Sequence, residues 1–301
     1  MRIAITGCTG FVGRHLAARL MAAGHDVVVV SRRTGHPIGA GAVDLATAFR
    51  GCDAVVHCAG INRELGSQTY GRVHVEGTAA VIAGAKAAGV ERLVMLSFLR
   101  ARPDGPTAYH RSKWAAEESL RASGLTYTIL KAGVIHGRGD HMLDHLSHAF
   151  HTFPVFGLVG FRERPVRPVA VTDVVRLLEA AAVGDARLAD RTISVLGLDE
   201  MQLGSAVRQV ARVTGRHPRF VRLPIPVHLG IACLAEWTML VPLISRAQVQ
   251  ILAEGVVVPL PFADTPPADL APATPFSDEV IRLGLPPPGG FGRTDLRCTI
   301  A

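Results

Sequence analysis

MRIAITGCTGFVG, residues 1–13, joins a short apolar strand to three glycines and to the start of an amphipathic helix. Gly7 allows a tight turn, Gly10 lets the backbone approach a ligand without a Cβ, and Gly13 allows close packing of helix and sheet. The helix N-terminus adds N–H groups and the positive end of the helix dipole. The stretch is typical of a loop that holds the pyrophosphate of a dinucleotide.

The residues that follow continue as alternating strands and helices. Further strands are predicted at 27–30, 53–58, 93–97 and 126–130, with helices at 11–23, 68–88 and 107–124. Strict alternation up to residue 135 indicates an α/β protein. We predict a Rossmann fold, a doubly wound parallel sheet with helices on both faces.

The organisation changes after Gly137. Helices are predicted at 140–153, 172–182, 201–214 and within 224–254, with a short extended piece at 165–171. A proline-rich tail starts at residue 259 and carries one short helix near 277–279. We predict a dinucleotide-binding Rossmann domain over residues 1–137 and a smaller, mainly helical substrate lobe over 138–301, from which some segments return to the Rossmann core.

The choice of cofactor depends on Ser31, Arg32 and Arg33, which follow the second strand. A site for NAD(H) usually has an acidic residue here, whereas arginine suits a 2′-phosphate. NADP(H) is therefore the preferred cofactor, with NAD(H) as the alternative, although two arginines of an arginine-rich surface would look the same. The other residues expected at the cofactor are Thr9, Phe11 and Val12 in the loop, Asp44 and Leu45 near the adenine, and Cys58, Ala59 and Gly60 after the third strand.

Composition excludes several classes of protein. The 301 residues are 49% hydrophobic and carry a formal net charge of +7, but they contain no basic tail and no basic run interleaved with aromatic residues. We therefore expect no nucleic-acid partner. The five cysteines are scattered and include no CxxC pair, which argues against a disulfide framework and against a zinc site.

The apolar stretch 227–244 is the one candidate for a membrane segment. His228, Glu236 and Pro242 interrupt it, which favours a buried or interfacial helix over a span. A core strand in the first residues leaves no room for a signal peptide. We expect a cytoplasmic protein, and loose association with a membrane stays open.

Tyr109 and Lys113 are four residues apart on a predicted helix, hence on one face. A free phenol has a pKa of about 10, but a nearby ammonium and a positive nicotinamide ring would favour the phenolate. Tyr109 would then pass a proton to or from a substrate oxygen, and Lys113 would also bind the nicotinamide ribose. Ser97, at the end of the preceding strand, is the third candidate. An isolated pair of this kind is more often an ordinary surface feature.

Five histidines, His136, His141, His145, His148 and His151, cluster around one predicted helix. Their spacing, with Asp140 and Asp144 nearby, would suit a metal. Apolar residues interleave with them, however, and favour a pocket wall or a core helix, so no metal is expected. Asp173 is expected to be a helix cap or a first-turn acid.

Together these motifs resemble the extended or atypical short-chain dehydrogenases/reductases, the epimerase/dehydratase-like group. The matching segments are 6–13, 57–60, 76–78, 109–113 and 130–137. The chain is most similar to the branch that contains the nucleotide-binding accessory subunit of respiratory complex I. The resemblance implies that Lys131, Gly133 and Val134 also lie at the cofactor.

Four features depart from the pattern of that family. Leu99 stands where extended members have a catalytic Ser or Thr, and His74 where an Asn is common. Lys131-Ala132 replaces Arg-Pro, and the connection from Ser97 to Tyr109 is short. These departures leave cofactor binding intact and put the Ser/Tyr/Lys reaction in doubt.

Three functions follow from these observations. The leading hypothesis is an NADP(H)-dependent oxidoreductase that acts on a small carbonyl or alcohol. The alternatives are a non-catalytic NADP(H)-binding structural or sensor protein, and a nucleotide-sugar epimerase or dehydratase. A small-molecule substrate is expected, and an oligomer is compatible with the sequence.

Overall fold

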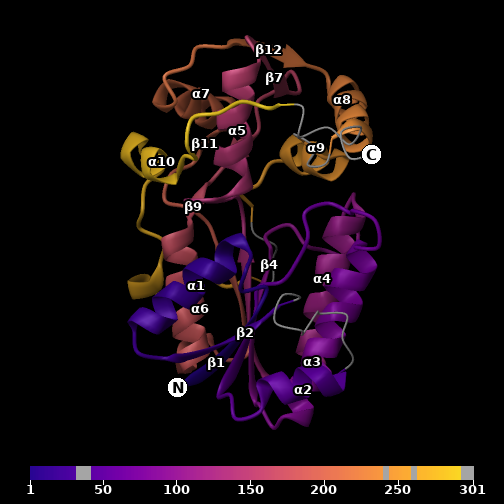
Figure 1. Cartoon of the computed structure of the whole chain (residues 1–301), viewed down its shortest axis with the longest axis vertical. Helices are drawn as coiled ribbons and strands as arrows, with labels where there is room; N and C mark the ends of the chain where they lie inside the picture. Colours follow the sequence, from indigo (N-terminus) through magenta and orange to yellow (C-terminus); the bar gives the residue numbers. More distant parts are fainter. Residues whose placement is uncertain (32–41, 240–243, 259–262, 293–301) are drawn as a thin grey trace. The chain divides into compact units, whose positions relative to one another are not determined.

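The computed structural model describes residues 1–31, 42–239, 244–258 and 263–292 (Figure 1). The chain divides into two compact units. The first contains residues 1–133, 171–196 and 258–273, and the second contains the rest. The division into a dinucleotide-binding domain over 1–137 and a substrate lobe over 138–301 stays a prediction.

A six-stranded sheet forms the centre of the first unit. Its strands run in the order β2-β1-β3-β4-β5-β10, and all neighbouring pairs are parallel. Their bounds are β2 Asp26–Val30, β1 Arg2–Thr6, β3 Ala54–His57, β4 Arg92–Phe98, β5 Thr126–Ala132 and β10 Arg191–Val195. The order turns back between β1 and β3, the switch point at which doubly wound sheets bind ligands. The predicted Rossmann sheet is confirmed.

Helices cover both faces of this sheet, as predicted. On one face α1 (Phe11–Ala22) packs against α6 (Val171–Val183), and on the other α2 (Ala42–Phe49) packs against α3 (Gly77–Ala87), which also contacts α4 (Ala108–Arg121). A π-helical turn, Gly71–Glu76, precedes α3. The helix predicted over residues 68–88 therefore begins with a π-helical turn in place of an α-helical one, and His74 in this turn is buried.

Apolar side chains of the strands and of α2, α3 and α4 fill the space between the sheet and these helices. Leu45 and Phe49 of α2 are fully buried there with Val81 of α3 and Leu93 of β4. Central parallel strands are apolar on both faces, which explains why β1, β3 and β5 read as almost continuous hydrophobic runs.

The second unit is mainly helical. Its helices are α5 His141–Thr152, α7 Leu203–Val213, α8 Ile225–Thr238, α9 Arg246–Glu254 and α10 Asp278–Gly284. Short strands join in pairs: β7 (Val155–Val159) with β12 (Arg219–Leu223), β8 (Pro165–Val166) with β11 (Met201–Gln202), and β6 (Ile135–His136) with β9 (Val169–Ala170). No helix in the described part of the chain combines the length and the apolar character needed to cross a bilayer.

The histidine-rich helix is α5, and it contributes to the core of the second unit. Leu143 and Phe150 are buried in a cluster with residues of α7 and α10. Asp140 caps the helix, because its carboxylate accepts the N–H of Leu143 at 2.7 Å. Across the described ranges, no cluster of histidine, cysteine and acidic side chains has the makings of a metal site.

Asp173 lies in the first turn of α6, as expected. Its carboxylate accepts the N–H of Ala273 at 3.2 Å and pairs with Arg176 at 3.3 Å. It therefore anchors the returning segment 258–273 to the first unit.

Candidate active site

The glycine loop between β1 and α1 is packed backbone against backbone. Gly7 has a φ of +71°, and a Cβ there would lie 2.7 Å from the Cα of Ala59. Gly10 donates its N–H to the Gly7 carbonyl at 2.9 Å. A Cβ on Gly13 would overlap that same carbonyl oxygen. Gly7 and Gly13 are therefore required by the close approach of the chain to itself, whereas the role of Gly10 beside a ligand stays a prediction.

The N-terminus of α1 is suited to an anionic group. Gly10 is the cap residue and supplies no side-chain hydrogen bond, and the first turn contains no acidic residue. The first N–H groups of a helix and its dipole attract phosphate. The backbone conformation and the missing side chains at Gly7 and Gly10 thus fit the pyrophosphate of a dinucleotide.

The carboxyl ends of β1, β2 and β3 bring several predicted cofactor residues together. Gly7 donates to Val30 at 3.3 Å, next to the buried Ser31, and Cys58 donates to Thr6 at 3.0 Å. Burial raises the pKa of the Cys58 thiol to about 12, so this cysteine stays protonated. Ser31 and the segment 58–60 therefore lie beside the glycine loop. Arg32 and Arg33 lie outside the described residues.

Two residues predicted to contact the adenine separate on α2. Asp44 is exposed, whereas Leu45 is fully buried and packs against Gly84 of α3. The Leu45 side chain belongs to the hydrophobic core, so a contact of Leu45 with the adenine, which stays a prediction, would have to come from its backbone. A contact from Asp44 stays a prediction.

Gly60 connects the glycine loop to the predicted catalytic helix. A Cβ on Gly60 would lie 3.0 Å from Nζ of Lys113, while its neighbour Ala59 touches Gly7. Lys113 lies on α4 and donates to the Leu96 carbonyl at 3.5 Å. The two motifs, 100 residues apart in sequence, thus meet at one edge of the sheet.

Tyr109 sits one turn before Lys113 in a cluster of rings. Its ring centroid lies 5.6 Å from that of Tyr70, 5.5 Å from His74 and 5.2 Å from Phe98, all in edge-to-face geometry. Edge-to-face packing of this kind fixes the orientation of the phenol. Thr107 starts the helix by accepting the N–H of His110 at 3.3 Å.

The predicted phenolate depends on a bound nicotinamide ring and stays a prediction, while burial acts on Tyr109 in the opposite direction. Burial, with a smaller contribution from Tyr70, raises the pKa of Tyr109 above its usual range. Burial also lowers the pKa of Lys113 to about 8, although Glu117 and Cys58 oppose that shift. Desolvation disfavours the charged form of both groups, so without a cofactor the Tyr109 phenol keeps its proton.

His74, where the family commonly has Asn, ties the segment after β3 to α4. Its Nε2 accepts the N–H of Ile61 at 3.1 Å, so that nitrogen carries no proton. Its Nδ1 then donates to Ser112 Oγ at 2.8 Å, and Ser112 donates to the Tyr109 carbonyl at 3.0 Å. A neutral His74 therefore braces the turn that carries Tyr109 and Lys113.

A second buried histidine, His57, bridges two threonines. Its Nδ1 lies 2.6 Å from Thr6 Oγ1 and its Nε2 lies 3.2 Å from Thr78 Oγ1. Burial, reinforced by the positive charge of Lys113, lowers the pKa of His57 to about 3 and that of His74 to about 2. Both histidines are neutral in the folded protein.

These two histidines should make the fold sensitive to acid. Their pKa values lie below the ordinary 6.5, so their contribution is complete above pH 6.5 and is lost as the pH falls toward 3. Each proton bound only by the unfolded chain lowers the unfolding free energy by about 1.4 kcal/mol per pH unit. We expect His57→Asn to reduce this slope between pH 6 and 4 by about that amount in urea titrations. The exposed His217→Asn is the control, and an equal change there would contradict the assignment.

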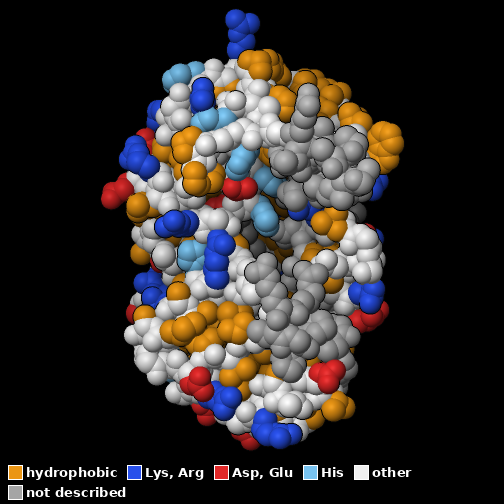
Figure 2. Space-filling model, in the orientation of Figure 1, with side chains coloured by type: hydrophobic (Ala, Val, Ile, Leu, Met, Phe, Trp, Pro, Cys, Tyr) orange, Lys and Arg blue, Asp and Glu red, His pale blue; other side chains and the backbone are white. Residues whose placement is uncertain are grey.

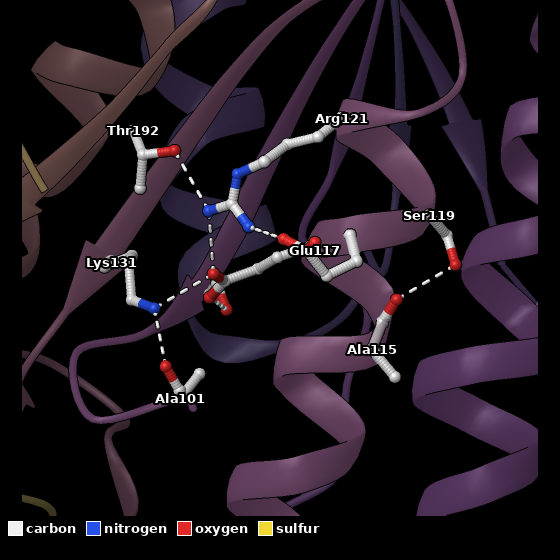
Figure 3. A network of polar contacts seen from close by, with 9 residues as sticks. Ala101, Ala115, Glu117, Ser119, Arg121, Lys131 and Thr192 are labelled. Carbon is white, nitrogen blue, oxygen red and sulfur yellow. Dashed lines mark hydrogen bonds and ion pairs between the residues drawn. The ribbon is translucent and has the colours of Figure 1, made fainter. Parts of the chain in front are cut away.

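Ser97 and Lys131 meet at a buried carboxylate that was not among the predicted site residues, Glu117. Figure 3 shows Glu117 between Lys131 and Arg121. Ser97 donates to Glu117 Oε1 at 2.6 Å, and Lys131 donates to Oε2 at 2.9 Å and to the Ala101 carbonyl at 2.8 Å. Arg121 also donates to Glu117, at 3.0 Å. Glu117 and Lys131 are both almost completely inaccessible to solvent. In the sequence, Glu117 is marked only by its position one helical turn after Lys113, on the same face of the helix.

This network changes what two predicted site residues can do. The ammonium of Lys131 is buried in an ion pair with Glu117. The structure therefore does not support a contact between this ammonium and the cofactor. The Ser97 hydroxyl donates its hydrogen bond to Glu117, and Leu99, two residues later, is fully buried. The role of Ser97 as substrate orienter stays a prediction, as does cofactor contact by Gly133 and Val134, whose backbones bond to Val195 and Val169.

Comparison with known proteins finds NAD(P)-binding relatives of this chain. A family model described as NAD(P)H-binding matches residues 40–145. A ceramide reductase of Caulobacter vibrioides is 30% identical over 262 residues, which cover 79% of this chain and 78% of that protein. The (4-alkanoyl-5-oxo-2,5-dihydrofuran-3-yl)methyl phosphate reductase of Streptomyces griseus is 30% identical over 238 residues, covering 74% and 77%.

The resemblance to complex I also appears in these comparisons. Mouse NADH dehydrogenase [ubiquinone] 1 alpha subcomplex subunit 9 is 24% identical over 261 residues, 78% of this chain and 68% of that protein. Among solved structures, a nucleoside-diphosphate-sugar epimerase from Staphylococcus aureus superposes with a TM-score of 0.70 at 14% identity, covering 94% of this chain and all of that one. At this identity the match speaks for the fold alone.

Proposed function

This chain belongs to the extended or atypical short-chain dehydrogenases/reductases, and on that premise we propose that it is an NADP(H)-dependent oxidoreductase acting on a small carbonyl or alcohol. One observation carries the proposal. The backbone of Ala59-Gly60 touches Gly7 of the glycine loop on one side and Lys113 on the other. A dinucleotide on the loop would thus extend toward Tyr109 and Lys113 at the carboxyl edge of the sheet.

Each residue of this edge has a role in the proposal. Gly7, Gly10 and the N-terminus of α1 hold the pyrophosphate, and Lys113 binds the nicotinamide ribose. The bound nicotinamide would supply or accept the hydride. Tyr109 donates a proton to the substrate oxygen, and His74 keeps its helix in position.

We assign Tyr109 the role of proton donor in the reduction of a carbonyl, since a phenol carries a proton at neutral pH. Two relatives with 30% identity are named as reductases, which supports the same direction. The preference for NADPH rests on Arg32 and Arg33, whose charges suit a 2′-phosphate.

Cofactor titration tests the proposal. We titrate the protein with NADPH and with NADH and follow the fluorescence of each cofactor. The Kd for NADPH should be at least about tenfold lower than the Kd for NADH, since each hydrogen bond from an arginine to the 2′-phosphate is charge-assisted. Gly13→Ala should abolish binding of both cofactors, because its Cβ overlaps the Gly7 carbonyl. Gly230→Ala is the matched control, since a Cβ at that helical glycine meets nothing within 4 Å.

The same titration has outcomes that would reject parts of the proposal. If Arg32→Ala and Arg33→Ala leave the preference unchanged, the arginines do not read the phosphate. If Gly13→Ala binds NADPH like the wild type, the loop is not the cofactor site. A screen of carbonyl compounds with NADPH then identifies the substrate class.

A specific observation favours a second candidate, a non-catalytic NADP(H)-binding protein. Ser97 donates its proton to Glu117, and Leu99 provides no hydroxyl at the other expected position. Tight NADPH binding without any turnover that depends on Tyr109 would establish this reading in place of the enzyme.

A further inference from the structure

Helix α8 in the second unit is mostly apolar, and in the described part of the chain one side of it is buried and the opposite side is exposed. His228, Ala232 and Ala235 are buried, and His228 lies 3.3 Å from the Gly157 carbonyl of β7. The opposite side exposes Val227, Ile231, Leu234 and Trp237, which we call the apolar face of α8. Leu234 is 59% exposed and Trp237 76%. A helix without a polar face is normally covered on both sides.

The exposed side of α8 carries no charge that would favour contact with water. The other exposed residues on it are Pro226, Gly230 and Cys233. The one acidic residue of the helix, Glu236, is held at its flank by Arg246, with 2.9 Å between carboxylate and guanidinium. In Figure 2, hydrophobic side chains gather at the upper right, where Figure 1 places α8.

Arginines and one exposed aromatic residue surround the N-terminal end of the helix. Phe161 is 65% exposed, and Arg222 donates to its carbonyl at 2.8 Å. A hollow of about 210 Å³ is lined by Phe161, Arg162 and Arg164 together with Ile225, the first residue of α8. Arg162 and Arg164 are exposed, while the intervening Glu163 is mostly buried and pairs with Arg208 and Arg222. Arg162 and Arg164 thus lie beside the N-terminal end of α8.

We propose that α8 and the loop 160–164 dock this protein on the surface of a membrane that contains anionic lipids. Aliphatic side chains and a tryptophan would enter the interface, and the arginines would meet the lipid headgroups. A helix of 14 residues is about 21 Å long and would lie in the plane of the interface. The arginines at the N-terminal end of the helix favour an anionic lipid surface over a second copy of this chain, which offers the same positive charge.

Vesicle flotation with the full chain tests this proposal. We expect binding to vesicles of phosphatidylcholine mixed with phosphatidylglycerol, and weak binding to phosphatidylcholine alone. Leu234→Glu should lower the affinity for the mixed vesicles by at least about tenfold, because a carboxylate would replace the apolar end of the leucine side chain. Leu283→Glu is the matched control, since Leu283 is exposed on α10, away from this face. Arg162→Gln and Arg164→Gln should each lower the affinity for vesicles that contain phosphatidylglycerol by about fivefold, and should leave the affinity for pure phosphatidylcholine vesicles unchanged.

Tryptophan fluorescence gives an independent readout. The chain contains two tryptophans, and Trp114→Phe leaves Trp237 as the single probe. Its emission should shift to shorter wavelength when mixed vesicles are added. No shift, no flotation, or equal loss of binding in Leu283→Glu would overturn the proposal. So would a dimer in light scattering that Leu234→Glu dissociates while vesicles stay unbound, since the face would then join two copies.

Discussion

Tyr109→Phe is expected to lower kcat for carbonyl reduction by about 10²–10⁴-fold, the range over which a positioned general acid acts. Phenylalanine keeps the ring contacts with Tyr70, His74 and Phe98, so the site should stay folded. Only the proton at the substrate oxygen is lost. NADPH affinity should therefore stay within about twofold of the wild type, because the phenol takes no part in holding the pyrophosphate.

Steady-state kinetics on the best carbonyl substrate, with NADPH titration in parallel, checks this result. Tyr127→Phe is the matched control, since Tyr127 lies on β5 and is not a member of the ring cluster around Tyr109. Full turnover by Tyr109→Phe would remove this residue from the mechanism. Equal losses in both variants would point to a general effect of removing a phenol.

The second large effect concerns stability. Glu117→Ala is expected to lower the free energy of unfolding by about 3–5 kcal/mol, the cost of leaving a buried charge without its partner. Lys131 would retain the Ala101 carbonyl and the face of the Trp114 ring but no negative charge, and Ser97 would lose its acceptor. Arg121 can turn toward solvent, so its contribution to the loss is small.

Urea denaturation followed by circular dichroism measures this difference. Glu118→Ala is the control on the next residue, whose carboxylate is exposed and pairs with Arg121 alone at the surface. Exposed pairs of this kind contribute about 0–1 kcal/mol. Similar losses in the two variants would mean that the buried pair adds nothing to the fold.

Much of the first unit could be predicted from the sequence because its signals are local. The apolar runs, the helical periodicities and the glycine spacing of residues 7–13 act over a few residues, and each element keeps its type after packing. The spacing of Tyr109 and Lys113 placed both on one helix face for the same reason. The burial of the Leu45 side chain and the rise in the pKa of Tyr109 could not be predicted in this way, because both depend on packing.

The sequence by itself therefore determined a Rossmann sheet, its glycine loop and the helix that carries the Tyr/Lys pair. Only the tertiary structure decided that Glu117 meets Lys131 and Ser97, that His74 braces the segment after β3, and that α8 leaves one apolar face uncovered. Ion pairs and buried histidines join residues that are distant in sequence, and their partners and solvation exist only after the elements pack. The glycine loop needs its own few residues, whereas the charge of every group around it is set by the whole fold.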